Sequence, residues 1–385
     1  MRTLPCQTAA EVAERVAAAA AGLRRLTVVG RGSKAAWGVP VEADAVLDVS
    51  GLAGVVAYEP EELLLSVRPG TPLEEVQALL AERGQQLAFE PPDYGWVLSR
   101  QSAWGTIGGA VSVNASGPRR FRAGAARDHL LGVTAVSGLG ETFRAGGRVV
   151  KNVTGYDLPK LLAGAFGTLG VLVELHLKVV PAPEDTATLV IRGLSDTEAL
   201  EALGEVARSP HEATGLAHWP DPSEGARTVV RVEGFTASVA HRIGALAKQL
   251  GGRGETEVLD ATASEPLWAA VRDGRPVADA AMVWLVSVPP TGALQVLEGA
   301  RPEWWLLDHA GGRVWLGYDE ARAEQAEQVR GALVQGGHAT LLRAPEAVRR
   351  AVPVFQPRPT AHANLLRRVK EAMDPEGILE PGRMG

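Results

Sequence analysis

The sequence is poor in cysteine, has no excess of basic residues and has no long hydrophobic run. Cys6 is the one cysteine among 385 residues, which excludes internal disulfides, cysteine zinc sites and an iron–sulfur cluster held by this chain. A formal net charge of -6 offers no basic face for nucleic acid. No apolar stretch approaches the roughly 20 residues that span a bilayer. These absences favour a cytoplasmic protein without a transmembrane segment, which would reach the inner face of a membrane only through partners.

Length and composition indicate a globular chain of more than one domain. Hydrophobic residues make up 46% and charged residues 22%, and 385 residues exceed what one ordinary core supports. The segment P-A-P-E-D at 181–185 is typical of a linker, and the composition changes after it. We therefore expect one domain at 1–185, a smaller one at 186–345 and a C-terminal segment at 346–385.

Glycines recur every few residues between Gly105 and Val180. This stretch contains G-T-I-G-G at 105–109, R-D-H-L-L-G at 127–132, K-N-V-T-G-Y-D-L at 151–158 and G-T-L-G-V-L-V-E at 167–174. Glycine permits positive φ and lets a ligand touch the main chain directly. The spacing therefore favours a backbone shaped around a ligand, and a run of tight turns is the alternative.

A second glycine loop, G-R-G-S-K at 30–34, follows the expected strand Leu26 to Val29. The pattern G-x-G-x-x-A also fits a Rossmann turn, which must open into a crossover helix. Gly38 and Pro40 leave no room for that helix before the next expected strand, Ala45 to Val49. A glycine loop between two strands instead offers consecutive N–H groups as an anion site, which suits a pyrophosphate.

These motifs, in this order, resemble the FAD-binding domain of the vanillyl-alcohol-oxidase-like, or PCMH-type, flavoproteins. Within that superfamily the sequence is similar, over nearly its whole length, to a family of FAD-binding subunits of bacterial glycolate oxidases. The resemblance implies an α+β fold: a two-subdomain FAD-binding domain, a smaller α/β cap, and a tail that returns to the FAD domain. It implies that the first loop grips the FAD diphosphate and that Thr106 to Gly109 cross the flavin.

The resemblance and the loop chemistry together give the candidate FAD-binding residues. Asn114 is assigned either to the flavin edge or to its own turn. Because Arg31, Ser33 and Lys34 occupy the first loop, where some relatives carry a histidine linked to FAD, we expect noncovalent FAD. The full set is Gly30, Arg31, Gly32, Ser33, Lys34, Pro69, Gly70, Pro92, Thr106, Ile107, Gly108, Gly109, Asn114, Gly170, Val171 and Arg383.

Local signals predict several secondary-structure elements. Thr8 with Glu11 forms a capping box, and Thr71, Pro72 and Glu74 predict another helix start. Strict alternation predicts a strand after Gly170 that ends at Pro181 and exposes His176. Arginines 119, 120 and 122 are interpreted as a solvated surface run. In the second domain we expect strands at 188–191, 228–232, 282–288, 304–308 and 314–318 and helices at 196–208, 236–250 and 319–335.

No catalytic residue can be assigned from the sequence. His211 and His218 have the spacing of a metal motif, H-x-G-D-G-N-x-H, found in hydroxyacid dehydrogenases of this superfamily. The residues between them lack its Asp, Asn and glycines, so we interpret the spacing as coincidence and expect no metal. Arg272 is one candidate for a substrate carboxylate, among many arginines.

The resemblance implies an FAD-binding subunit of a complex with a second flavin subunit and an iron–sulfur subunit. Such complexes oxidise glycolate and related D-2-hydroxyacids to the 2-oxoacids, and this chain would relay electrons or support the catalytic subunit. A stand-alone FAD-dependent 2-hydroxyacid oxidoreductase and an FAD-free scaffold are the alternatives.

Overall fold

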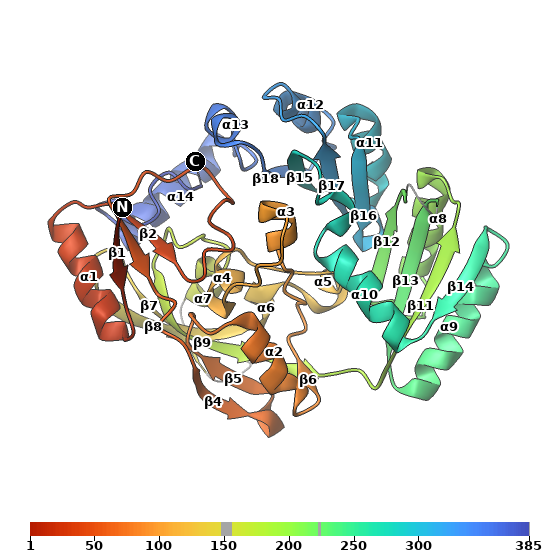
Figure 1. Cartoon of the computed structure of the whole chain (residues 1–385), viewed down its shortest axis with the longest axis horizontal. Coiled ribbons are helices and arrows are strands. Elements are labelled where there is room, and N and C mark those ends of the chain that lie inside the picture. The colour runs from red at the N-terminus through yellow and green to blue at the C-terminus, as the bar shows by residue number, and fades with distance from the viewer. Residues whose placement is uncertain (148–155, 222–224, 385) are drawn as a thin grey trace.

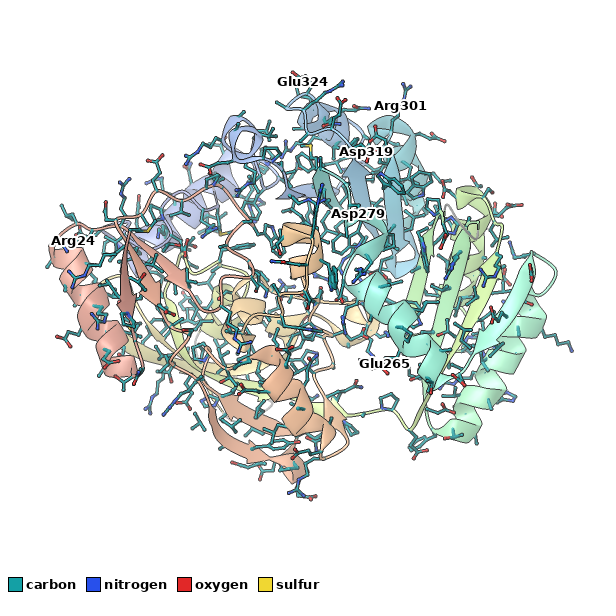
Figure 2. The ribbon with its side chains drawn as sticks, viewed as in Figure 1. Arg24, Glu265, Asp279, Arg301, Asp319 and Glu324 are labelled. Atoms are coloured by element: carbon teal, nitrogen blue, oxygen red, sulfur yellow. The ribbon has the colours of Figure 1, made fainter. Side chains whose placement is uncertain are left out.

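The computed structural model describes residues 1–147, 156–221 and 225–384. Figure 1 shows two sheets and short helices in the N-terminal part and one large sheet in the second part. Charged side chains such as Arg24, Glu265 and Glu324 point outward from both parts (Figure 2). The molecule is therefore α+β, as the sequence predicted.

A three-stranded parallel sheet forms the N-terminal edge, in the order β1 (Arg2–Pro5), β3 (Ala45–Asp48), β2 (Leu26–Val29). Helix α1 (Ala9–Ala21) buries Val12 and Val16 against it. The predicted capping box is confirmed, because Thr8 Oγ1 accepts from Glu11 N and Glu11 Oε2 accepts from Thr8 N. Strand β2 thus ends where the first glycine loop begins.

A five-stranded antiparallel sheet lies beside it. Its central strand is the predicted alternating strand, β9, and β7 pairs with β8 as a hairpin. The order is β4 (Val55–Glu59), β5 (Leu64–Val67), β9 (Val171–Lys178), β7 (Leu130–Val136), β8 (Thr142–Gly146). His176 is half-buried rather than exposed, since its Nδ1 lies 2.8 Å from Ser66 Oγ on the neighbouring strand β5.

Short helices connect these strands. In α2 (Leu73–Ala81) the predicted Thr71 cap is wrong: Thr71 Oγ1 donates to Arg68 O at 2.7 Å, and Pro72 is the N-cap residue. A two-stranded ladder joins β6 (Gln85–Gln86) to β10 (Val180–Pro181) just before the chain leaves this part. The other helices are α3 (Gly95–Ser99), α4 (Ile107–Ser112), α5 (Arg120–Ala123), α6 (Ala126–His129) and α7 (Leu158–Leu162).

An eight-stranded antiparallel sheet forms the second part. Its strand order is β14 (Glu255–Leu259), β11 (Asp185–Arg192), β13 (Arg227–Gly234), β12 (Gly215–Trp219), β16 (Trp304–Asp308), β17 (Arg313–Tyr318), β15 (Met282–Ser287), β18 (His338–Arg343). The five predicted strands are present, and β12, β14 and β18 were not predicted. The proposed boundaries at 185 and 345 remain predictions.

Helices cover both faces of this sheet. One face packs against α8 (Asp196–Ala207), α9 (Thr236–Leu250), α11 (Ala293–Ala300) and α12 (Gln325–Gly331). The helix predicted at 319–335 is too long, because residues 319–324 are not helical and α12 begins after them. The other face packs against α10 (Ala261–Arg272) and the N-terminal part. One hydrophobic cluster contains residues of both parts, among them Trp37 and Trp315.

The C-terminal segment crosses back to the start of the chain. After α13 (Glu346–Ala351), helix α14 (Thr360–Met373) ends just before Asp374. Leu379 then forms a parallel bridge with Leu26 of β2, and Figure 1 shows both termini near the three-stranded sheet. Within the described ranges, none of the helices has both the length and the apolar character to cross a membrane.

Candidate functional site

A cleft opens between the three-stranded and the five-stranded sheet. It encloses about 820 Å³ of space, part of it open to solvent. The loop after β2, the start of α4, the start of β9 and the C-terminal tail form its walls. Its lining is Val28, Val29, Gly30, Arg31, Gly32, Ser33, Lys34, Ala35, Trp37, Val49, Pro69, Thr106, Gly108, Gly109, Ser112, Val113, Phe166, Gly167, Gly170, Val171, Leu172, Glu380 and Arg383.

The loop at 30–34 presents unused backbone donors. The N–H groups of residues 31–34 donate no hydrogen bond to any residue that the structure describes. Gly32 has a φ of +73°, in the left-handed region that favours glycine. Consecutive free N–H groups around such a turn form a concave site for an anion. This loop can therefore hold a phosphate or diphosphate.

Lys34 adds a positive charge to this wall. Its Nζ lies 3.1 Å from Ser33 Oγ and 3.4 Å from Trp104 O. Burial lowers the pKa of Lys34 to about 8, although Asp93 acts in the opposite direction. An anion bound beside this ammonium would favour its charged form. The Lys34 side chain is therefore suited to contact a negatively charged ligand.

The start of α4 forms a second part of the wall and lies directly against the loop, since a Cβ at Gly30 would lie 2.9 Å from Thr106 Oγ1. A Cβ at Gly108 would lie 2.4 Å from Pro69 Cβ, so the helix can approach this turn only with glycine there. The backbone N–H groups of this segment are already hydrogen-bonded within the protein. Ile107 N donates to Thr71 O, Gly108 N to Pro69 O and Gly109 N to Thr106 Oγ1. This wall therefore shapes the cleft, but its backbone N–H groups are not available to a ligand.

The tail closes the cleft beside the loop. Glu380 accepts from Val28 N at 2.6 Å and pairs with Arg383 at 2.8 Å. Arg383 Nη1 also donates to the carbonyls of Ala35 and Trp37. Because these contacts occupy the guanidinium, Arg383 lines the cleft mainly as a residue that fixes the loop.

The cleft brings together twelve of the sixteen candidate residues: Gly30, Arg31, Gly32, Ser33, Lys34, Pro69, Thr106, Gly108, Gly109, Gly170, Val171 and Arg383. Gly70, Pro92, Ile107 and Asn114 do not line it. Gly70 lies against the carbonyls of Val49 and Leu52, and Pro92 and Ile107 are buried. That these twelve residues contact FAD stays a prediction.

Asn114 has the second of the two roles that the sequence left open, that of a turn residue. It has a φ of +51°, and its Oδ1 accepts from Arg127 N at 3.0 Å, so it stabilises a turn between α4 and α6.

Residues 151–155 of the K-N-V-T-G-Y-D-L motif lie outside the described residues. Trp37, Phe166, Leu172 and Glu380 line the cleft but were not predicted, since nothing in their local sequence marks them.

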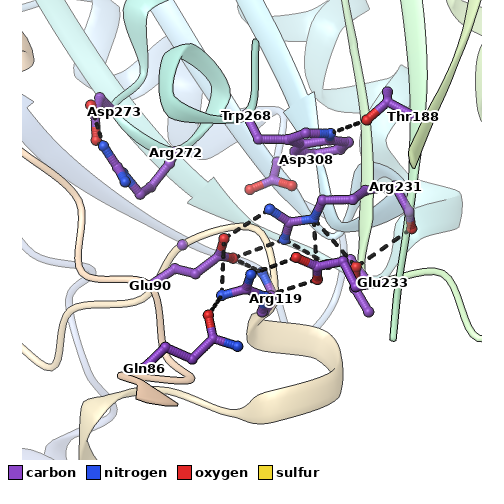
Figure 3. A network of polar contacts seen from close by, with 12 residues as sticks. Gln86, Glu90, Arg119, Thr188, Arg231, Glu233, Trp268, Arg272, Asp273 and Asp308 are labelled. Atoms are coloured by element: carbon purple, nitrogen blue, oxygen red, sulfur yellow. Dashed lines mark hydrogen bonds and ion pairs between the residues drawn. The ribbon is translucent and has the colours of Figure 1, made fainter. Parts of the chain in front are cut away.

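A buried ionic network joins the two parts of the molecule (Figure 3). Arg231 of β13 donates to both oxygens of Glu90, at 2.8 and 3.0 Å. Arg119 donates its Nε to Glu233 Oε2 at 2.9 Å and its Nη1 to Gln86 Oε1 at 2.9 Å. Burial alone would raise the pKa of Glu233, but Arg231 and Arg119 lower it to about 2. The two carboxylates are therefore ionised and paired.

This network corrects our interpretation of the arginine run. Arg119 is mostly buried at the interface, and Arg122 Nε donates across it to Ala213 O. Arg120 is exposed, as expected, and donates to Ser116 Oγ. The run was misread because its partners lie about a hundred residues away in the sequence.

The remaining candidates have structural roles here. Arg272 pairs with Asp273 at 2.7 Å and covers the ring of Trp104. His218 lies in strand β12 and contacts Thr228 Oγ1 and Asp196 Oδ1. In the part of the chain that the structure describes, no group of three or more His, Cys, Asp or Glu could hold a metal ion.

Comparison with known proteins identifies the family. A family model described as "FAD binding domain" matches residues 3–146. "Glycolate oxidase subunit GlcE" of Escherichia coli (strain K12) is 34% identical over 381 residues, covering 98% of this chain and 98% of that protein. The chain belongs to the glycolate oxidase subunit GlcE family. It is an FAD-binding protein of the oxidoreductase class.

Other similarities of this GlcE-family chain are partial or concern the fold. "Glycolate oxidase subunit GlcD" of Bacillus subtilis (strain 168) is 32% identical over 169 residues, which is 43% of this chain and 34% of that relative. A structure of p-cresol methylhydroxylase with substrate bound has a TM-score of 0.71 at 14% identity, covering 100% of this chain and 88% of that chain. An alkyldihydroxyacetonephosphate synthase structure has a TM-score of 0.70 at 16% identity, covering 98% and 75%. The last two show the fold alone.

The cleft of this GlcE-family chain fits FAD on its own chemistry. The N–H groups of residues 31–34, which donate to none of the described residues, and Lys34 suit the diphosphate. Bound FAD supplies hydride acceptance, and the protein supplies position and electrostatics. No histidine is present among residues 30–34, and noncovalent attachment stays a prediction.

Proposed function

We propose that this chain is the FAD-holding subunit of a heteromeric glycolate oxidase. Its partners would be a second flavin subunit and an iron–sulfur subunit. The complex would oxidise glycolate, and related D-2-hydroxyacids, to glyoxylate and the corresponding 2-oxoacids. This subunit would relay electrons through its FAD or support the catalytic subunit, with little turnover of its own.

The end-to-end similarity to the Escherichia coli GlcE protein carries this proposal. It extends over 98% of both chains, whereas the GlcD relative aligns with 43% of this chain. The similarity to GlcD is thus confined to less than half of the chain. The remainder of the chain also aligns with the GlcE protein, which is named as a subunit. This favours a role within an assembly.

The interface between the two parts also supports this role. Arg231, Glu90 and Arg119 fill its centre with ion pairs, and Arg313 Nη1 donates across it to Ser116 O at 2.9 Å. Every one of these groups is already paired with protein. Such an interface is suited to holding the two parts in one fixed arrangement.

The proposal is tested by comparing the isolated chain with the reconstituted complex. Glycolate and D-lactate are supplied with a dye acceptor, and dye reduction is followed for this chain alone, for the partners alone and for the mixture. We expect negligible turnover from the isolated chain and a large gain when it joins its partners. Appreciable turnover by the isolated chain would instead favour a stand-alone oxidoreductase. Denaturation should release all of the FAD if attachment is noncovalent.

A further inference from the structure

The C-terminal tail is anchored before it reaches the cleft. Asp374 is buried and accepts a hydrogen bond from Leu379 N at 2.9 Å. Lys370 Nζ donates to Leu379 O at 2.8 Å, and Leu379 pairs with Leu26 of β2. Residues 380–383 therefore follow a fixed point of the fold and have a defined place in the cleft wall.

The chain that follows the first glycine loop wraps around Arg383. Arg383 Nη1 donates to Ala35 O at 2.8 Å and to Trp37 O at 2.9 Å. Val39 N donates in turn to Arg383 O at 3.0 Å. Gly38 has a φ of +101°, and a Cβ there would lie 2.6 Å from Arg383 Cδ, so this turn favours glycine. Arg383 therefore holds the segment directly after the first glycine loop.

Glu380 brings a carboxylate into the wall of a cleft that suits a diphosphate. Among the described residues that line the cleft, it is the one with an acidic side chain. Its Oε1 accepts from Val28 N at 2.6 Å, two positions before the first glycine loop. Like charges in a partly buried site oppose each other, so an unpaired carboxylate there would repel the phosphates of FAD. The fold must therefore offset this charge for FAD to bind.

Arg383 supplies the countercharge. Its Nε and Nη2 lie 2.9 and 2.8 Å from Glu380 Oε2, and the two side chains are only 10% and 2% exposed. We propose that Arg383 is a positioning residue for FAD, which holds the first glycine loop and neutralises Glu380 so that the diphosphate can bind beside it. This role needs no contact between Arg383 and the cofactor. The inference rests on FAD binding in the cleft, and it holds whether or not the chain works within a glycolate oxidase.

The first test removes the countercharge. Arg383→Met keeps a long side chain and removes the guanidinium, so Glu380 is left unpaired beside the diphosphate. In isothermal titration of the isolated chain, we expect the FAD dissociation constant to rise about 10- to 100-fold. The matched control is Arg367→Met on α14, which removes an exposed arginine paired with Glu371 and should bind FAD like the parent protein. Parent affinity in Arg383→Met overturns the proposal.

The second test separates the charge of Arg383 from its support of the loop. Glu380→Gln removes the carboxylate and keeps an oxygen that can accept from Val28 N. Added to Arg383→Met, it removes the repulsion, and we expect the double variant to regain about tenfold in affinity over Arg383→Met alone. Loss of loop support alone predicts that the double variant binds no better than Arg383→Met, and that result contradicts the proposal.

The third test does not depend on the folding of Arg383→Met. In Glu380→Gln alone, Arg383 adds a positive charge without a countercharge, so FAD should bind roughly 3- to 10-fold more tightly than to the parent protein. Thermal unfolding without FAD shows whether each variant is folded. A folded Glu380→Gln that binds FAD no more tightly than the parent overturns the proposal, whatever the complex as a whole does with glycolate.

Discussion

The cleft and the buried interface both contain several polar groups, but those of the interface are paired with one another and those of the cleft loop are not. In the cleft, the N–H groups of residues 31–34 find no protein partner among the described residues. At the interface, Glu90 and Glu233 are paired with two arginines each. Consecutive backbone N–H groups left unpaired around a turn suit an anionic ligand. Buried charges that are paired with one another hold the two parts of the protein together.

This difference should also appear as separable effects of mutation. Changes in the cleft should alter FAD binding and leave the fold intact. Changes at the interface should lower stability and leave the intrinsic affinity for FAD nearly unchanged. Substitutions that broke this division would show that the two regions act as one.

The largest expected effect is the loss of FAD in Gly109→Arg. A Cβ at Gly109 meets its first neighbour at 3.4 Å, so the backbone tolerates a side chain, but the arginine would project into the cleft. We expect a folded protein without yellow colour. Gly244→Arg, on the exposed side of α9 with no atom within 4 Å of an added Cβ, is the control and should keep FAD. Absorbance of the purified variants measures the bound flavin, and stoichiometric FAD in Gly109→Arg would contradict the placement.

Glu90→Gln tests the interface. It leaves Arg231 and Arg119 without a full countercharge in a buried site, and breaking a buried ion pair costs about 3–5 kcal/mol. The matched control is Glu42→Gln, whose exposed pair with Arg350 at 3.2 Å should contribute less than about 1 kcal/mol. Urea unfolding gives both free energies. Similar losses in the two variants would mean that burial does not strengthen the network.

A smaller effect is expected from pH through Lys34. Burial holds the pKa of the free site at about 8, and a bound diphosphate should raise it. Below about pH 8 the lysine is charged with or without FAD, so affinity is highest there. Above that value binding must take up a proton, and the dissociation constant should rise up to about tenfold per pH unit.

Titrations at several pH values, in buffers of different ionisation enthalpy, measure this proton uptake. Lys34→Met should bind FAD more weakly below pH 8 and lose most of the pH dependence. Lys160→Met removes an exposed lysine paired with Asp157 and should retain it. If the parent protein binds equally at pH 7 and 9.5, Lys34 does not face the phosphates.

The sequence predicted those features that depend on near neighbours. The Thr8 capping box, the alternation of β9 and the helix 236–250 depend on residues within a few positions of one another. The first glycine loop was recognised because its glycines, Ser33 and Lys34 lie consecutively. Thr71 failed as a cap since its hydroxyl found the carbonyl of Arg68 instead.

Features that depend on distant residues could not be predicted. Glu90 and Arg231 are 141 positions apart, so no local pattern in the sequence marks them as a buried pair. Trp37 borders the cleft because the returning tail binds its carbonyl, and no local pattern marks that contact. Asn114 was ambiguous because flavin contacts and turns favour the same side chain.

A crystal structure of the chain with FAD tests the central claim most directly. The account predicts that the diphosphate accepts hydrogen bonds from backbone N–H groups of residues 31–34, within reach of Lys34 Nζ, while the Glu90–Arg231 pair stays intact. FAD bound outside this cleft, or a diphosphate that contacts none of these N–H groups, would contradict it.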